Sequence, residues 1–374
     1  MKLGHVFDPR NNALNAWRLV LAASVVLLHS WGVTGRVIWS RPVYQLMLCA
    51  GVDGFFAISG FLITASWLSN PRLREYLIAR ALRILPAFYV CLLVVAFVIA
   101  PIGVAMQGGS AAKLVLSGAP LEFVLKNSAV AMVQFDIGGT PQGVPVAGQW
   151  DTPLWTLMWE VLCYLAVAAL GVVGLVSRRW IPAVIFALAW VGALLSPHII
   201  VGGGLVSQQN DLATSLLYIV ARIAMMFSAG ALIYQYRNVI PARWSLVALS
   251  VVIVMASSLL PDYRLVGALP LAYALITSAS LIRNRRLQLR TDLSYGVYIY
   301  AFPIQQLLVI GGLAFLSPFL FFGVSMLATL PVAALSWFLI EKRALALKSR
   351  FRRRAAVGPE AAPQGLGADR RAGN

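Results

Sequence analysis

Long apolar stretches alternate with short polar segments along the chain, and ten of these stretches are candidate membrane-spanning helices. A helix needs about 20 apolar residues to cross the hydrocarbon core of a bilayer. An α-helix also satisfies all of its own backbone hydrogen bonds in lipid. The ten windows are residues 13–33, 46–68, 84–105, 153–176, 180–198, 213–235, 243–260, 264–282, 293–313 and 318–340. This pattern predicts an all-α fold, a polytopic membrane helix bundle of about ten transmembrane helices.

An even number of crossings places both termini on the same side of the membrane. If that side is cytoplasmic, the inner segments hold 24 of the 30 Lys and Arg residues and the outer segments hold five, while Arg222 lies inside a window. Cytoplasmic loops of membrane proteins carry an excess of Lys and Arg. We therefore expect both termini in the cytoplasm of a bacterial-type cell, with the protein multi-pass in its cytoplasmic (inner) membrane.

Two segments fall outside the predicted spans. Residues 106–152 form a long outer loop that is rich in Gly and Pro and that we expect to be irregular. Residues 348–374 have the composition of a disordered basic tail that lies against anionic lipid headgroups. Residues 1–347 then form one membrane domain, without an internal repeat or a removable signal peptide.

Composition supports the same class. The 374 residues are 60% hydrophobic and 11% charged, whereas a soluble domain has about 25% charged residues. The net charge of +17 is explained by topology signals, because no basic stretch is interleaved with aromatic residues as in a nucleic-acid surface. Three cysteines, Cys49, Cys91 and Cys163, lie in apolar runs and suit packing. We expect no disulfide framework, no metal site and no nucleic-acid partner.

The first window carries a charge near one end and a histidine near the other. Arg18 and His29 are 11 residues apart in WRLVLAASVVLLHSWG. On a helix this spacing puts both on one face, roughly 16 Å apart along the axis. One stripe of an apolar helix thus offers a fixed cation and a titratable base.

Other ionisable residues lie at a similar predicted depth. Asp53, Glu160 and Arg222 each sit within the outer half of their windows, as does His29. Such residues cost about 2.5–3.5 kcal/mol each at mid-membrane, so each is a functional candidate. We expect the four to converge, with Glu160 or Asp53 orienting His29. The alternative is that they pair with one another and fix helix packing.

A second cluster lies at the predicted cytoplasmic side. RLREYLIARALRILP contains Arg72, Arg74, Arg80 and Arg83, and Arg18 reaches the same level. Gathered arginines suit bidentate binding of phosphates. Topology signals alone would also place arginines here, and that alternative stays open.

These stretches together resemble the acyltransferase 3 family of integral-membrane enzymes. The resemblance rests on the Arg18–His29 spacing, on GVDGFFAISGFLIT and RALRILPAFY, and on LWTLMWEVLCY and SYGVYIYAFPIQQ. It implies a ten-helix fold, with His29 as the essential base and Arg18 as its essential partner. Arg80 and Arg83 match arginines before a proline, here Pro86.

The resemblance also brings in Glu160 as the family's acidic position, and it shows departures. Many members have His where this chain has Ala301, so a second histidine is absent. The approach to the fourth window reads GQWDTPLWTL, which departs from the family's commoner Asn-Gly-Pro-Leu-Trp at a place expected to contact the acceptor. Arg222, Ser59 and Tyr298 are further pore-lining candidates.

The expected function is membrane O-acyl transfer, with acyl-CoA as donor substrate and no permanently bound cofactor. The cytoplasmic arginines would hold the phosphates of acyl-CoA, and His29 would act as general base on a hydroxyl of an extracytoplasmic glycan or lipid-linked glycan. Transient acylation of His29 is a second route. Acetyl is favoured over succinyl, and the sequence does not identify the acceptor. A transporter or flippase is the alternative class, although such folds often carry internal repeats.

Overall fold

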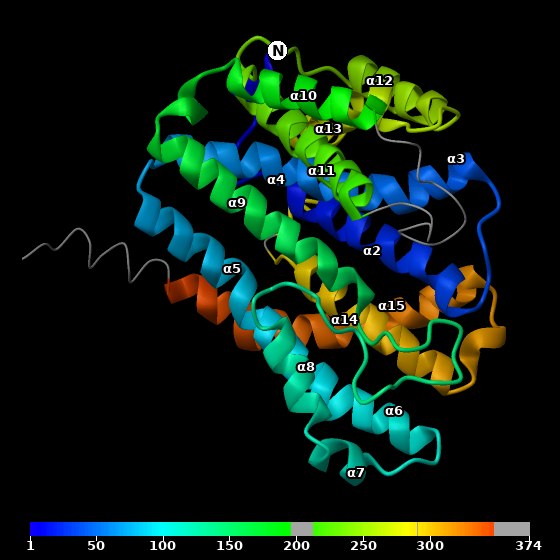
Figure 1. Ribbon diagram of the computed structural model, residues 1–374. Coiled ribbons are helices and arrows are strands. Elements are labelled where there is room, and N and C mark those ends of the chain that lie inside the picture. Colours follow the sequence, from blue (N-terminus) through cyan, green and yellow to red (C-terminus); the bar gives the residue numbers. More distant parts are fainter. Residues whose placement is uncertain (196–211, 290, 348–374) are drawn as a thin grey trace, which may run out of the picture.

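The structure is a computed structural model that describes residues 1–195, 212–289 and 291–347 (Figure 1). The described residues form helices and no β-strand. The α-helices are α1 (Leu3–Val6), α2 (Leu14–Val33), α3 (Arg41–Tyr44), α4 (Ala50–Ser69), α5 (Leu73–Val94), α6 (Ala100–Met106), α7 (Ala111–Leu116), α8 (Ala119–Asn127), α9 (Trp155–Val172), α10 (Ile181–Leu195), α11 (Leu212–Gln235), α12 (Trp244–Ser257), α13 (Arg264–Leu281), α14 (Ser294–Ile310) and α15 (Pro318–Ser336). Short π-helical turns extend three of them, at Gln45–Cys49, Val95–Ile99 and Trp337–Glu341.

Seven helical segments of the described chain are long and apolar enough to cross a membrane. They are Leu14–Val33, Arg41–Ser69, Leu73–Met106, Thr152–Val172, Ala213–Gln235, Arg264–Leu281 and Pro318–Leu347. Three shorter apolar helices, α10, α12 and α14, have 15, 14 and 17 residues. Each predicted window overlaps one of these ten segments. The all-helical, multi-pass prediction is thus supported, and the count of ten crossings stays a prediction.

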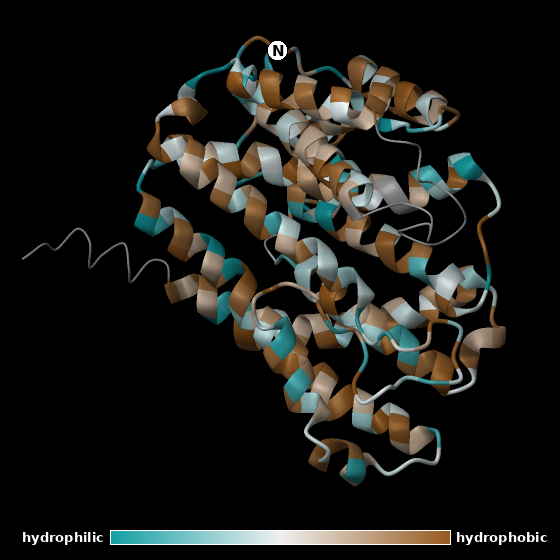
Figure 2. Ribbon diagram, in the orientation of Figure 1, coloured by the Kyte–Doolittle hydropathy of each residue, from teal (hydrophilic) through white to brown (hydrophobic). Residues whose placement is uncertain are grey.

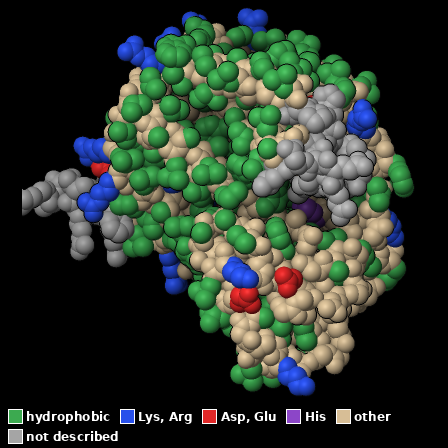
Figure 3. All heavy atoms as spheres, in the orientation of Figure 1, with side chains coloured by type: hydrophobic (Ala, Val, Ile, Leu, Met, Phe, Trp, Pro, Cys, Tyr) green, Lys and Arg blue, Asp and Glu red, His purple; other side chains and the backbone are tan. Residues whose placement is uncertain are grey.

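The long helices lie side by side along a common direction, and α6, α7 and α8 project from one end (Figure 1). Apolar residues dominate α10 and α12 at the upper edge of the bundle (Figure 2). Large apolar side chains are exposed on both helices, among them Leu188 and Val252. Hydrophobic side chains also cover the upper part of the face in Figure 3, with Lys and Arg at its margins. This surface suits contact with lipid rather than water.

Two glycines let α4 and α11 pack backbone against backbone. A Cβ atom on Gly60 would lie 1.9 Å from the carbonyl oxygen of Phe227, and one on Gly230 would lie 1.8 Å from that of Ala57. Small residues permit such close approach between membrane helices.

Contacts farther apart along the two helices give their direction. Asp53 of α4 pairs with Arg222 of α11, and Phe61, later in α4, packs on Tyr234, later in α11, so the two helices run parallel.

The structure differs from the sequence prediction in two segments. The third window was expected to start at residue 84, but α5 begins at Leu73, so this helix includes the arginine-rich stretch before the window. The outer loop, residues 106–152, was expected to be irregular, but it contains α7 and α8. The predicted tail, residues 348–374, lies outside the described residues.

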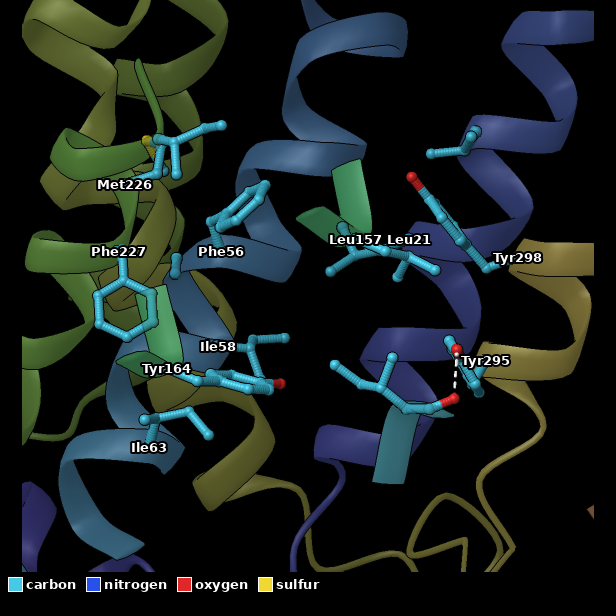
Figure 4. Packing of buried hydrophobic residues seen from close by; sticks show 14 of the residues in the cluster. Leu21, Phe56, Ile58, Ile63, Leu157, Tyr164, Met226, Phe227, Tyr295 and Tyr298 are labelled. Atoms are coloured by element: carbon cyan, nitrogen blue, oxygen red, sulfur yellow. Dashed lines mark hydrogen bonds between the residues drawn. The ribbon is translucent and has the colours of Figure 1, made fainter. Parts of the chain in front are cut away.

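The buried core joins α4, α9, α11 and α14. Figure 4 shows Tyr164 of α9 with its hydroxyl directed toward the side where Tyr295 and Tyr298 of α14 lie. Leu157 lies between the two groups, and Phe56 lies on the α4 side. These large side chains are buried, and all of them except Tyr164 line a small internal space that is described next.

Candidate active site

Helix α2 carries Arg18 near its start and His29 near its end. The helix is unbroken from Leu14 to Val33, so the predicted stripe exists as a rigid element. We call the end of the bundle where α2 and α5 begin the basic end, because Arg18 and Arg83 lie there. His29 lies 11 residues along α2 from Arg18, roughly 16 Å farther along the helix axis.

At the basic end, one carboxylate bridges two helices. Asp292, directly before α14, accepts hydrogen bonds at Oδ2 from the guanidinium groups of both Arg18 and Arg83. The Ser294 hydroxyl donates to its other oxygen, Oδ1. Burial alone would raise the pKa of Asp292, but the two arginines lower it to about 2. Glu341 is a second carboxylate near Arg83, at 3.8 Å.

Arg80 lies in a different environment from its neighbours. Its guanidinium carbon lies 6.0 Å from the ring centre of Tyr76 and 5.8 Å from that of Tyr164, within the range of cation–π attraction. Within the described chain no carboxylate forms an ion pair with it, and its buried Nε has no hydrogen-bond partner. Arg80 is therefore a partly buried arginine of the cluster whose charge no described carboxylate balances.

The other two arginines of the predicted cluster lie at the surface. Arg72 pairs with Glu75 at 2.9 Å, and its side chain is 68% exposed. Arg74 is also exposed, at the first turn of α5. Both are accessible to a large anion, but the structure gives them no part in the buried contacts of Arg18 and Arg83.

A cavity of about 40 Å³ lies between α2, α4, α9 and α14, and we call it the central cavity. Its lining contains three predicted site residues besides Arg18, and their polar groups converge on it. The lining residues are Arg18, Val52, Phe55, Phe56, Ser59, Thr156, Leu157, Glu160, Ser294, Tyr295 and Tyr298. Ser59 and Tyr298 thus line an internal space, as predicted, whereas Arg222 is not among its walls.

Glu160 is the acidic group of the central cavity. It accepts a hydrogen bond from Ser59 at 3.3 Å and another from the hydroxyl of Tyr164. Ser59 belongs to the neighbouring helix α4, and Tyr164 lies one turn farther along α9 itself. Glu160 therefore faces the same space as Arg18, and the structure does not join it to His29 as the sequence prediction expected.

His29 lies beyond the central cavity. Its ring packs edge-to-face on Phe302, with centroids 5.1 Å apart and planes at 85°. Phe302 follows Tyr298 on α14 by one helical turn, about 6 Å along the axis. Gln305 fixes α14 against α2 at this level by donating to the Val26 carbonyl and to Ser30, both at 3.0 Å. Arg18, the cavity and His29 therefore follow one another along α2 and α14.

Asp53 and Arg222 form a separate buried network. Asp53 accepts from Arg222 at 2.8 Å, and from Arg264 and Tyr263 at 2.6 Å each. Arg264 also pairs with Asp262 at 2.9 Å. The prediction that four ionisable groups converge was wrong, because both oxygens of Asp53 are already bonded within this network. Pairing, the alternative, describes Asp53 and Arg222 correctly.

The amino-acid sequence of this chain matches a known protein family. The profile of a family described as an acyltransferase domain matches residues 11–338. The chain belongs to the acyltransferase 3 family. The match spans every residue from Arg18 to Tyr298, so the predicted resemblance is confirmed and this protein is an acyltransferase. Membership in an enzyme family favours acyl transfer over the transporter alternative.

Two curated relatives match this acyltransferase over nearly their whole length. The O-acetyl transferase of Shigella phage Sf6 is 28% identical over 350 residues, which cover 91% of this chain and 98% of the relative. Nodulation protein 10 of Rhizobium leguminosarum bv. viciae is 26% identical over 362 residues, covering 92% and 96%. No solved structure gives a significant match.

Sequence reasoning missed three charged residues of this acyltransferase. Asp292 stands alone among the arginines that precede α14, and Glu341 is an acid inside the last apolar stretch. Each had a signal, since an acidic residue in such a place needs a basic partner. Arg264 was counted as an outer-loop charge, yet its side chain is 0% exposed.

Proposed function

We propose that this acyltransferase moves an acetyl group from cytoplasmic acetyl-CoA to a hydroxyl group of an extracytoplasmic glycan or lipid-linked glycan. The name of the phage relative, an O-acetyl transferase, supports acetyl as the group and oxygen as the acceptor atom. The observation that carries the proposal is the order of groups along α2. Arg18 lies at the basic end of the central cavity, and His29 lies beyond its other end.

The proposed topology has ten crossings, with both termini and the basic end on the cytoplasmic side of the inner membrane. Windows two and six correspond to α4 and α11, which run parallel. Helices that cross in alternating directions give this result only if an odd number of crossings separates the two. Because α5 and α9 are both long enough to cross, α10 must cross as well. The parallel contact thus supports α10 as a crossing, despite its 15 residues.

In this topology the phosphates of acetyl-CoA bind at the basic end. Arg18 and Arg83 present guanidinium groups to one point, which Asp292 occupies. Arg80 adds a positive charge that no described carboxylate pairs. Guanidinium groups bind phosphate oxygens through two parallel hydrogen bonds, so this cluster matches a pyrophosphate or a sugar phosphate.

The pantetheine arm of the donor would lie along the central cavity. Glu160 is placed to accept a hydrogen bond from an amide N–H of the arm, and this replaces its predicted contact with His29. A cavity of about 40 Å³ has room for only a few water molecules, since one water needs about 10–15 Å³ of such space. The helices around it must therefore separate when the arm enters.

At the far end of the cavity, His29 would remove the proton from the acceptor hydroxyl. The acceptor oxygen then attacks the thioester carbonyl, the C–S bond breaks, and the CoA thiolate takes the proton from the imidazolium. Such general base catalysis contributes about 10²–10⁴-fold to a rate. In the second route, His29 itself attacks the thioester and passes the acetyl group on to the hydroxyl.

The test replaces the imidazole. His29→Ala should leave the protein folded, because the ring packs edge-to-face on Phe302 and forms no hydrogen bond with another described residue. In bacteria that produce the protein, the surface glycan should lose the acetate that mild base releases from O-acetyl esters. Acetate release equal to wild type, from cells with equal amounts of the variant in the membrane, would overturn the role of His29.

A further inference from the structure

We propose that Asp292 occupies, in the donor-free protein, the position that a phosphate group of the donor takes between Arg18 and Arg83. Binding of the donor then displaces the carboxylate. This inference rests on the proposed function, in which acyl-CoA is the donor. It assigns Asp292 the role of an internal counter-ion that competes with the donor, rather than that of a residue which helps to bind it.

The first argument is the geometry of the bridge. One oxygen of Asp292, Oδ2, accepts hydrogen bonds from both guanidinium groups, which come from two different helices. A phosphate oxygen accepts the same charge-assisted bonds from the same two donors. The position of Oδ2 therefore marks a point where a single anionic oxygen can contact α2 and α5 together.

The second argument is charge balance. Arg18 and Arg83 carry two positive charges, and Asp292 between them offsets one. An incoming phosphate would therefore meet a pair of arginines whose attraction for anions is already reduced. Without the Asp292 charge, the pair attracts an anion more strongly.

The third argument is accessibility. The side chains of Arg18 and Arg83 are 20% and 15% exposed, and that of Asp292 is 7% exposed. The other buried network differs, since Asp53 and Arg264 are 1% and 0% exposed. An anion can thus approach the Asp292 bridge from solvent, whereas the Asp53 network is closed.

The fourth argument is the size of the central cavity. Arg18 and Ser294, which both contact Asp292, also line this cavity. The arm of the donor needs more than the present 40 Å³, so the walls must move. The Asp292 bridge ties the start of α14 to α2 and α5, and its displacement frees that start to move. Phosphate binding and opening of the cavity would then be one event.

The experiment compares Asp292→Asn with wild type in detergent, by calorimetric titration with acetyl-CoA and, separately, with inorganic pyrophosphate. The variant should bind both probes more tightly, with Kd lower by about ten-fold, equivalent to about 1.4 kcal/mol. The matched control is Asp262→Asn, which also removes a buried carboxylate from an arginine, Arg264, but not at the basic end. Its Kd for acetyl-CoA should equal that of wild type.

Each outcome decides one claim. An unchanged or higher Kd for both probes in Asp292→Asn would overturn the competition and show that the carboxylate positions the arginines. Tighter pyrophosphate binding without any acetyl-CoA binding would keep the counter-ion role and reject the donor.

If Asp292→Asn does not fold, Ser294→Ala provides the second test. Its hydroxyl holds Oδ1 of Asp292, and its removal makes the carboxylate easier to displace. The Kd for pyrophosphate should fall by about two- to three-fold, a change of about 0.5 kcal/mol. An unchanged or raised value would contradict the proposal.

Discussion

Asp151, just before the helical turn that leads into α9, is a fully buried carboxyl group without a basic partner among the described residues. The thiol of Cys91 donates to its Oδ2 at 3.6 Å, and its Oδ1 has no partner. Burial raises the pKa of Asp151 well above its usual range. The folded protein therefore keeps a proton that the unfolded chain releases above about pH 4.

From this difference we predict a pH-dependent stability. A raised pKa in the folded state makes stability fall as pH rises above the unfolded value, by at most about 1.4 kcal/mol per pH unit. Asp151→Asn has no proton to lose, so its melting temperature relative to wild type should rise from pH 5 to pH 8. The exposed Glu122→Gln serves as control and should follow wild type. A constant difference between Asp151→Asn and wild type would show that Asp151 ionises freely in the fold.

At the residue scale, the sequence located candidate charged groups but not the partners that they contact. Arg18 and His29 were predictable as a pair, because their spacing on one helix is local. Arg18 and Asp292 are 274 positions apart, and their contact depends on how α2 and α14 are rotated about their axes. Predicted depth placed His29, Asp53 and Glu160 together, but depth does not give the direction in which each side chain points.

At the element scale, the contact of α4 with α11 depends on two glycines. Asp53 and Arg222 lie on these two helices about two turns away from Gly60 and Gly230. The close approach therefore sets the distance across which that ion pair forms. The glycine contact between α4 and α11 thus stabilises the buried charges, although the glycines have no polar side chains.

We predict that Gly60→Ala destabilises the bundle, because its methyl group would overlap the Phe227 carbonyl oxygen. Overpacking of this kind costs about 1–3 kcal/mol, and the melting temperature in detergent should fall accordingly. The matched control is Gly323→Ala on α15, where a Cβ meets no atom within 4 Å and should leave the melting temperature unchanged or raise it slightly. Equal melting temperatures for the two variants would show that α4 and α11 can separate without cost.

Helix positions were largely predictable and helix ends were not. Hydropathy is a local property, and each apolar window coincides with a helical segment. A hydropathy window cannot detect α7, a short helix that begins at Ala111. Its N-cap is Ser110, whose hydroxyl accepts from the backbone N–H of Lys113. It also ends at the first charges, so it missed the arginine-bearing start of α5.

At the scale of the whole molecule, the two groups of buried charges have different surroundings. The basic end combines partial exposure, a pair of arginines bridged by Asp292, and Arg80, which no described carboxylate pairs. The Asp53 network is closed and internally bonded. The central cavity begins at the basic end and extends toward His29. The proposed path of the donor accounts for all of these features, because the donor enters at the basic end and reacts beyond the cavity.

The central claim is that acetyl-CoA binds at the basic end, and titration of the purified protein with acetyl-CoA tests it most directly. Wild type should bind saturably, and Arg80→Ala should raise Kd by about ten-fold, the loss of one charge-assisted contact. Arg179→Ala, an exposed arginine before α10, should bind as wild type does. Absence of binding by folded wild type, or equal Kd values for Arg80→Ala and Arg179→Ala, would contradict the account.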